Sequence, residues 1–410
     1  MQTPDPRLVA APWRTARATL WLLDALEAGG KPARFVGGCV RDTLLGRARP
    51  GLDLDLATAE PPERVLALVA AAGIKAIPTG LQHGTVTAVV DHQPFEITTL
   101  RRDVATFGRH ATVAFTDDFT VDAARRDFTF NAMSADRAGH LFDPFGGEAD
   151  LMAGRVRFVG DPTTRIHEDY LRILRFFRFH AGFGREAPDA ATLAALGAGI
   201  AGMAHLSGER LQHELWKLLA APDPRAAVRH MDGIGLLAWL LGARVELLPF
   251  ERLVTVEPAP DALRRLAALL RATADPPRTH AGLVQRLKPS RADAERLARL
   301  IAVPARDLSA EDDGELRRWL YRQGKDAALA ATLFAVDRPL PGFADRLAAL
   351  ATPRLPLLGR DVLARGVPPG PAVGRLLAAI EAWWLEGGCV ADRAACLAEL
   401  ARRLEAPDRP

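Results

Sequence analysis

Cysteine is scarce in this sequence of 410 residues, which contains only Cys39, Cys389 and Cys396. Three cysteines are too few for a fold held together by disulfides, and their spacing is not that of a metal site. The first residues, MQTPDPRLVAAPWR, lack the apolar core of a signal peptide, and no run approaches 18 uncharged apolar residues. The sequence therefore predicts a protein of the reducing cytoplasm that has no membrane partner.

A large excess of charge of one sign is also absent. The 53 Lys and Arg residues nearly balance the 50 Asp and Glu residues, which gives a formal net charge of +3. Such a small net charge does not by itself predict a nucleic-acid partner. Hydrophobic residues make up 49% of the chain, so a large core is possible, and the length suggests two or three domains.

The first 150 residues differ from the rest in composition and hydrophobic pattern. Short runs rich in Val, Ile, Thr and Phe lie between turn residues and indicate strands, namely ARFVGG, LDLDLAT, GTVTAVV, PFEITTL and ATVAF. Helices are expected around them at residues 13–28, 40–45 and 62–72. After about residue 160 the strand signals stop, and Leu, Ala and Arg recur with helical periodicity.

We therefore predict an α+β protein with three parts. A small mixed-sheet head covers residues 1–150, a helical neck covers 151–220, and a helical body and tail cover 221–410. The helical part is expected to be elongated. No internal repeat is strong enough to indicate a solenoid.

The segment GLDLDLATAE, residues 51–60, places two acids on an otherwise apolar strand. Residues i and i+2 of a strand point to the same face, so Asp53 and Asp55 project together with their Cα atoms roughly 6–7 Å apart. The intervening leucines then face a core. Two adjacent carboxylates favour a divalent cation, and Mg²⁺ prefers carboxylates together with substrate phosphates. An edge strand with a solvated polar face explains this stretch, taken alone, equally well.

The preceding segment RFVGGCVRDTLLG, residues 34–46, is typical of a strand, a turn at Gly37 and Gly38, and the start of a helix. Glycines let backbone N–H groups approach a ligand closely, and a helix N-terminus favours anions. Arg41 in the first turn is unfavourable for the helix dipole unless a phosphate binds there. A phosphate-binding turn followed by a carboxylate pair predicts metal-assisted phosphoryl or nucleotidyl transfer.

The segment HEDYLRILRFFRF, residues 167–179, repeats arginine every three residues. Arg172, Arg175 and Arg178 therefore form a stripe along one side of a helix whose other sides are apolar. Such a helix lies beside a polar cleft, unless the arginines snorkel from a surface helix. Asp169 offers an acceptor and Arg172 a donor fork, so together they could read the edge of a nucleobase.

These motifs resemble, in this order, the class II polymerase-β-like nucleotidyltransferases, the family of the tRNA nucleotidyltransferases and poly(A) polymerases. The resemblance starts at GGCVRDTLLG and LDLDLAT and continues through HGTVTAVVDHQPFEITTLRRD, ARRDFTFNAMS, FDPFGG, RIHEDYLRILRFFRF and GERLQHELWKLL. It covers about the first 220 residues. The segment LLGRDVLARGVPPGPAVGRLL also resembles the C-terminal region of bacterial members.

The resemblance implies roles for the residues of the head. Gly38, Arg41 and Arg126 are expected to hold the nucleotide triphosphate, while Asp53 and Asp55 are expected to act as the catalytic Mg²⁺ ligands. In ARRDFTFNAMS, the charges before the apolar run could instead be solvated in a helix first turn. Asp127 and Asn131 are expected to make local hydrogen bonds.

The resemblance also implies how the nucleotide base is chosen. The residues that match Asp169 and Arg172 select C or A over G and U, and those that match Arg175 and Arg178 line the same pocket. The chemistry agrees with this role. Cytosine N4 and adenine N6 are donors whereas uracil O4 and guanine O6 are acceptors, so a fixed carboxylate favours C and A.

The segment SGERLQHELWKLL matches the Glu-Arg-x-x-x-Glu motif of the family at Glu209, Arg210 and Glu214. Ser207 is a plausible N-cap, and Arg210 and Glu214 are spaced to pair on one helix face. We expect this motif to be structural and to brace the turn near the nucleotide pocket.

Two features of the head stay open. Glu96 could be a third metal-site carboxylate, a partner of the metal ligands, or an ordinary polar strand residue, and it is not included in the metal set. In the loop TFGRHATVAF, Phe107 precedes Gly108 and Arg109, where family members often have Asp-Gly before Arg. The family associates this loop with the switch from C to A addition, so the departure puts the terminal A step in question.

The function implied is the addition of CCA to the 3′ end of tRNA from CTP and ATP, with Mg²⁺ and without a nucleic-acid template. The helical body and tail would bind the tRNA. Enzymes that add only CC or only A, a bacterial poly(A) polymerase, and a non-catalytic RNA-binding relative are the alternatives. The intact acids Asp53 and Asp55 argue against the last, and TGLQHGTVTAVV in place of a GRRF-type motif argues against a poly(A) polymerase.

Overall fold

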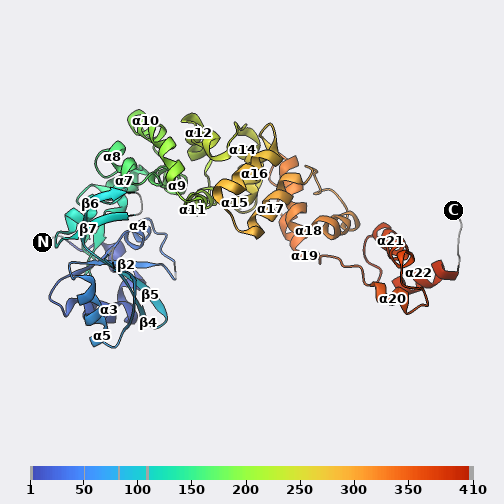
Figure 1. The fold of residues 1–410 in the computed structure, drawn as a ribbon, viewed down its shortest axis with the longest axis horizontal. Coiled ribbons are helices and arrows are strands. Elements are labelled where there is room, and N and C mark those ends of the chain that lie inside the picture. Colours follow the sequence, from blue (N-terminus) through green and yellow to red (C-terminus); the bar gives the residue numbers. More distant parts are fainter. Residues whose placement is uncertain (1–2, 50, 82–83, 108–109, 406–410) are drawn as a thin grey trace. The chain divides into compact units, whose positions relative to one another are not determined.

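The structure is a computed structural model that describes residues 3–49, 51–81, 84–107 and 110–405, with the backbone alone at 103–107 and 110–113. The chain divides into two compact units, Met1–Leu240 with Arg286–Lys288, and Leu241–Gln285 with Pro289–Pro410. Figure 1 follows the first unit from blue to green and the second from yellow to red. The predicted boundaries at residues 150 and 220 stay predictions.

A seven-stranded mixed sheet forms the head of the first unit, in the order β3-β4-β5-β2-β1-β8-β9. Strands β2 and β5 pair in parallel, while the other neighbouring strands are antiparallel. A separate antiparallel ladder joins β6 and β7. The strands are β1 (Ala33–Val36), β2 (Leu54–Thr58), β3 (Lys75–Gly80), β4 (Thr85–Val90), β5 (Gln93–Thr99), β6 (Arg101–Phe107), β7 (His110–Phe115), β8 (Ser134–Ala135) and β9 (Leu141–Phe142).

Short helices pack on and between these strands. The predicted helix at residues 13–28 is divided at Ala16, whose ψ of 139° is not helical. The helix predicted at 40–45 starts two residues earlier, and the one predicted at 62–72 is confirmed. Figure 1 shows α3 and α5 beside β4, which both helices contact. These helices are α1 (Pro6–Val9), α2 (Pro12–Thr15), α3 (Arg17–Glu27), α4 (Gly38–Leu44), α5 (Pro62–Ala71) and α6 (Phe119–Ala124).

Helices and 3₁₀ turns complete the first unit after the sheet. Helix α9 is central because it packs against both α11 and α12. Its phenylalanines join those of the segment after α6 in a buried aromatic cluster, in which the rings of Phe128 and Phe179 are 5.4 Å apart. The elements are η2 (Thr129–Asn131), α7 (Gly147–Ala153), α8 (Pro162–Glu168), α9 (Arg172–Phe183), α10 (Ala190–Gly199), η3 (Ile200–His205), α11 (Gly208–Leu219), α12 (Arg225–Gly233) and α13 (Leu236–Leu241).

The described secondary-structure elements of the second unit are all helices, joined by irregular segments. Arg265, only 1% exposed, contacts Glu257 at 2.5 Å, so this part of the core holds a buried ion pair. A second apolar cluster near the C-terminal end surrounds Trp384 and Leu400. The helices are α14 (Leu248–Val256), α15 (Ala262–Arg271), α16 (Pro276–Leu287), α17 (Arg291–Ala302), α18 (Asp313–Ala335), α19 (Phe343–Ala349), α20 (Gly359–Leu363), α21 (Pro371–Glu386) and α22 (Arg393–Glu405).

A mixed-sheet head followed by helices confirms the predicted fold class. All three cysteines are buried free thiols. Within the described ranges, none of the helices combines the length and the apolar character needed to cross a membrane.

Candidate active site

A cavity of about 460 Å³ opens in the first unit between the sheet, the segment after α6, and the start of α9. Its walls carry seven arginines and four acids, so it is a polar and charged site. Every residue predicted to bind nucleotide lines it, as does one of the two predicted metal ligands: Gly38, Arg41, Asp55, Arg126, Asp169, Arg172, Arg175 and Arg178. The cavity itself is not lined by the other predicted site residues, which are Asp53, Glu209, Arg210 and Glu214.

The carboxylates lie on an interior strand. Strand β2 runs between β1 and β5, so the alternative of an edge strand with a solvated face is wrong. Leu54 and Leu56 are buried, as predicted, while Asp55 is half-buried toward the cavity. Asp55 pairs in register with Glu96 on the parallel strand β5, and both side chains line the cavity.

Asp53 is exposed and precedes the first residue of β2, so the strand does not include it. Asp53 nevertheless affects the pKa of Asp55. Burial raises the pKa of Asp55 to about 6, and Glu96 and Asp53 add to the rise while Arg126 opposes it. The protein therefore leaves negative charge at this end of the cavity without full compensation.

Such a charge fits a divalent cation, because hard cations take carboxylate oxygens as ligands. Within the described ranges, no three His, Cys, Asp or Glu side chains stand close enough together to hold a metal ion by themselves. A site with two carboxylates suits Mg²⁺, which keeps water molecules and substrate phosphate oxygens among its ligands.

The turn between β1 and α4 forms the wall next to Asp55. Gly37 has φ of +70°, and a Cβ atom there would lie 3.5 Å from Arg126 Nη1 and 3.8 Å from Asp55 Oδ2. This left-handed conformation favours glycine. Gly38 begins α4 with an ordinary φ, and a Cβ there would meet Arg41 Nη2 at 3.8 Å.

Arg41 does not lie in the first turn of its helix, so the predicted conflict with the helix dipole is wrong. Helix α4 has only seven residues, and Arg41 is the fourth of them, close to the C-terminal turn. Its guanidinium donates to both carboxylate oxygens of Asp42, at 2.8 and 3.0 Å, and to Asn131 Oδ1 at 2.9 Å. Arg41 still lines the cavity, but in this structure protein groups balance its charge.

The segment after α6 joins the sheet to α9. Arg126 donates to Asp122 Oδ2 at 3.2 Å and to the Asn131 carbonyl at 3.3 Å. Asp127 accepts from the Phe128 N–H and from Asn131 Nδ2, each at 2.9 Å, which agrees with the local hydrogen bonds expected for both residues. Asp122 was not predicted as a site residue, although its spacing of three and four residues from Arg125 and Arg126 was a signal.

Asp127 is also the anchor for α9. Arg175 Nε donates to Asp127 Oδ2 at 2.7 Å. Burial alone would raise the pKa of Asp127, but Arg175 and Asn131 outweigh it and lower the pKa to about 2. The carboxylate is therefore ionised under all ordinary conditions and holds Arg175 against the cavity wall.

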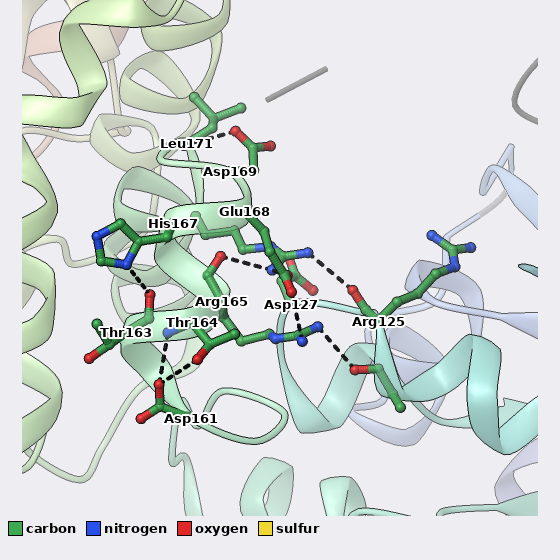
Figure 2. A network of polar contacts seen from close by, with 12 residues as sticks. Arg125, Asp127, Asp161, Thr163, Thr164, Arg165, His167, Glu168, Asp169 and Leu171 are labelled. Atoms are coloured by element: carbon green, nitrogen blue, oxygen red, sulfur yellow. Dashed lines mark hydrogen bonds and ion pairs between the residues drawn. The ribbon is translucent and has the colours of Figure 1, made fainter. Parts of the chain in front are cut away.

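The arginine stripe on α9 is confirmed, but Asp169 lies outside the helix. Helix α8 ends at Glu168, and Asp169 is extended with φ of −153° before α9 starts at Arg172. Arg172 donates to Glu168 at 2.5 Å and to the carbonyls of Arg165 and Arg125 at 2.8 and 3.1 Å. Figure 2 shows Glu168 directed toward the side of Asp127 and Arg125, whereas Asp169 points toward Leu171. The two predicted base-reading residues line one cavity from separate positions.

The motif on α11 braces this wall, but not through the pair expected. Arg210 contacts Asp169 Oδ2 at 2.7 Å, and the Leu171 N–H donates to Asp169 Oδ1 at 3.1 Å. Glu214, 5% exposed, contacts Arg178 Nε at 2.8 Å and Arg175 Nη1 at 3.8 Å. The predicted pairing of Arg210 with Glu214 is therefore wrong, because α11 presents both residues to α9 and to the segment before it.

The Arg178 contact with Glu214 is an ion pair whose angle is poor for a hydrogen bond. Burial lowers the pKa of Arg178 to about 10 in spite of Glu214. Glu209 is exposed and lies 3.9 Å from Lys288. Ser207 occupies the N-cap position of α11, but its side chain makes no capping hydrogen bond.

Some cavity residues were missed, and some predictions lie outside the described part. Gly108 and Arg109 fall outside the described residues, and Phe107 is described by its backbone in β6. Glu96 lines the cavity beside Asp55. Five further cavity residues lie within the quoted motifs but were not predicted as site residues: Thr85, Thr98, Arg101, Arg125 and Phe179.

Comparison with known proteins gives two family matches. Residues 33–157 match the poly A polymerase head domain, and residues 187–243 match the probable RNA- and SrmB-binding site of polymerase A.

Two relatives match this chain over most of its length. The mitochondrial CCA tRNA nucleotidyltransferase 1 of Danio rerio is 36% identical over 377 residues, which cover 86% of this chain and 83% of that protein. The CCA-adding enzyme of Lactobacillus delbrueckii subsp. bulgaricus is 31% identical over 366 residues, with 87% and 90% covered.

Two solved structures have a fold similar to that of this chain. The crystal structure of the Bacillus stearothermophilus CCA-adding enzyme with CTP superposes with a TM-score of 0.75 at 28% identity, covering 98% of each chain. The Thermotoga maritima CCA-adding enzyme complexed with tRNA has a TM-score of 0.67 at 20% identity, covering 98% of this chain and 100% of that one, and shows the shared fold.

Proposed function

This chain belongs to the family of the CCA tRNA nucleotidyltransferases and CCA-adding enzymes, and we propose that it adds CCA to the 3′ end of tRNA from CTP and ATP. One observation supports this activity above all. A single cavity carries carboxylates on β2 and β5, arginines along its walls, and a separately braced acid in the segment just before α9. These are the parts needed for a metal ion, a triphosphate and a nucleobase.

Divalent metal ions are general in this family, and we assign Asp53 and Asp55 as the ligands of Mg²⁺. When bound, Mg²⁺ supplies charge neutralisation on phosphate oxygens and favours ionisation of the attacking hydroxyl. The uncompensated charge at Asp55, with its pKa raised to about 6 by burial, Glu96 and Asp53, supports this assignment. Glu96 stands next to Asp55 in register and adds to the negative potential that attracts the cation.

The triphosphate is assigned to the arginines between the two ends of the cavity. Arg126 lies beside the Gly37–Gly38 turn and close to Asp55, and Arg175 is held by Asp127. Arginine forks match the geometry of phosphate oxygens and keep their charge at any working pH. Arg41 joins them after a shift of its Asp42 contact, since the same fork cannot serve both partners fully.

The base is selected at Asp169. Its two oxygens accept from Arg210 and from the Leu171 N–H, which fix the carboxylate in place. A carboxylate has further lone pairs that can accept from the exocyclic amine of cytosine or adenine. It repels the acceptor oxygens that uracil and guanine present at the same position. Arg172 supplies its remaining N–H donors to the ring acceptors of the same base.

The experiment offers three tRNA transcripts, which end at the discriminator base, at C, or at CC. Each receives one labelled nucleotide at a time with Mg²⁺. Addition of C, C and then A, followed by a stop, supports the full reaction. A halt after CC, or addition of A alone, would identify a partial enzyme, and long A tails would identify a poly(A) polymerase.

The Asp53→Ala and Asp55→Asn variants test whether the protein is a catalyst at all. Both should lose metal-dependent incorporation while the variants still bind tRNA. If the protein only binds RNA without catalysis, the unaltered protein will show no incorporation. Its tRNA affinity will then equal that of Asp53→Ala and of Asp55→Asn. Glu63→Gln, at an exposed position on α5 that does not line the cavity, is the matched control and should keep full activity.

A further inference from the structure

An exposed aromatic ring stands beside the cavity. Phe115, the last residue of β7, is 46% exposed. A Cβ atom on Gly84 would lie 2.9 Å from its Cε1 atom and 3.6 Å from its Cζ atom. The absence of a side chain at Gly84 therefore allows one edge of the ring to rest on the backbone, and nearly half of the residue stays open to solvent.

The backbone places this ring at the rim of the cavity. Phe115 is the direct cross-strand partner of Arg101 on β6, and cross-strand partners share one face of the ladder. Arg101 lines the cavity, and so does Thr85, which follows Gly84. Phe115 itself does not line it. The ring thus lies just outside, on the face that Arg101 presents to the cavity.

The rim lies close to the acids. Thr85 pairs with Thr98, which is two residues along β5 from Glu96, and Glu96 pairs with Asp55. The two residues along β5 span roughly 7 Å, and the two strand pairings add about 4.8 Å each across the sheet, so Thr85 and Asp55 lie roughly 12 Å apart. A nucleotide that stacks on the ring can therefore direct its sugar across the sheet toward the carboxylates.

We propose that Phe115 is the stacking platform for the terminal base of the acceptor RNA, and that it positions the 3′-hydroxyl over Asp55. This inference rests on the proposed function. The incoming nucleotide occupies the cavity, so an aromatic ring outside it faces the strand that enters from solvent. Single-stranded RNA ends are bound by stacking on aromatic side chains, which tolerates any base. Such tolerance is required when the terminal base changes with each addition.

The test compares Phe115→Leu, which keeps apolar bulk but removes the ring, with Phe115→Trp, which keeps a stacking face. Steady-state rates are measured with tRNA transcripts that end at the discriminator base and at C. Phe115→Leu should raise the KM for tRNA on the order of tenfold, with little change in kcat or in the KM for CTP. Phe115→Trp should restore the KM for tRNA.

Trp21→Leu is the matched control, because Trp21 is also exposed, at 38%, but lies on α3 and does not line the cavity. It should leave the KM for tRNA unchanged. A tRNA transcript with 2-aminopurine as its terminal base gives an independent measurement. Its fluorescence should be quenched by the unaltered protein and by Phe115→Trp, and much less by Phe115→Leu.

Three results would overturn the proposal while CCA addition persists. They are an unchanged KM for tRNA in Phe115→Leu, an equal loss in Trp21→Leu, or a rise in the KM for CTP instead of tRNA. The last would place the ring against the incoming nucleotide. Absence of any nucleotide addition by the unaltered protein would refute the proposed function itself, so the two failures are distinguishable.

Discussion

Replacement of Asp127 by Asn tests how the buried charges of the site are balanced. Asp127 is only 8% exposed and contacts Arg175, Asn131 and the Phe128 N–H. Asn keeps the size of the side chain and one acceptor oxygen but removes the charge. Arg175 would then lose the carboxylate that holds it.

The magnitude follows from the pKa of Asp127. The native structure lowers it from 3.8 to about 2, in spite of burial, through Arg175 and Asn131. A shift of this size corresponds to about 2–3 kcal/mol of stability at neutral pH. Because the native pKa is below the unfolded value, this stability is present above pH of about 4. It is lost as the pH falls from there through about 2.

Equilibrium urea denaturation of the unaltered protein and of Asp127→Asn at pH 7 measures the difference. A second pair of curves at pH 3 should show a smaller gap, because the unaltered protein has by then lost part of the contribution of Asp127. Asp223→Asn removes an exposed partner of Arg225 and should cost less than about 1 kcal/mol. Equal midpoints for Asp127→Asn and the unaltered protein at pH 7 would refute the reasoning.

Three further changes probe the rest of the site. Asp169→Ala should lose discrimination of C and A against U more than it loses rate, and full discrimination in a misincorporation assay would show that another group selects the base. Gly37→Ala should lower the free energy of unfolding by about 1–2 kcal/mol, because the φ of Gly37 is +70°. Gly38→Ala should leave the free energy of unfolding nearly unchanged, and thermal unfolding of both variants measures the difference. Glu214→Gln should lower the free energy of unfolding by about 1–3 kcal/mol, since Arg178 would remain largely buried without a charged partner. An unchanged midpoint of urea denaturation would contradict this expectation.

The active-site strand shows why some of the structure could be predicted from local sequence. The alternation of Leu54, Asp55 and Leu56 specifies which side chains are buried, because the period of a strand is fixed at two. The stripe of three arginines on α9 is predictable for the same reason, with the period of a helix. The runs that became β4, β5 and β7 are rich in β-branched residues. Those that became β1 and β2 have one such residue each but lie beside glycine turns or alternate apolar with acidic residues, whereas β8 and β9 have two residues each and offered no pattern.

Partners across the chain were much harder to predict. Arg210 and Glu214 are four residues apart and could pair on one helix, but the packing of α11 against α9 and the segment before it offers each a better placed charge. A pair within one helix gains little in water, while a partly buried contact with a second helix excludes water from both groups. Spacing alone contains no information about the neighbouring helix, so it gave the wrong partner.

The sequence by itself determined which chemistry is present: two acids separated by a leucine, a glycine turn, and arginines at helical spacing. The tertiary structure decided how that chemistry is used. It placed β2 in the interior of the sheet and brought Glu96 beside Asp55 from forty-one residues away. It also ended α8 before Asp169, so that Arg210 could hold the acid. Local periodicity is a property of the backbone and can be read from the chain. Convergence of distant side chains depends on burial and strand pairing, which only the folded molecule defines.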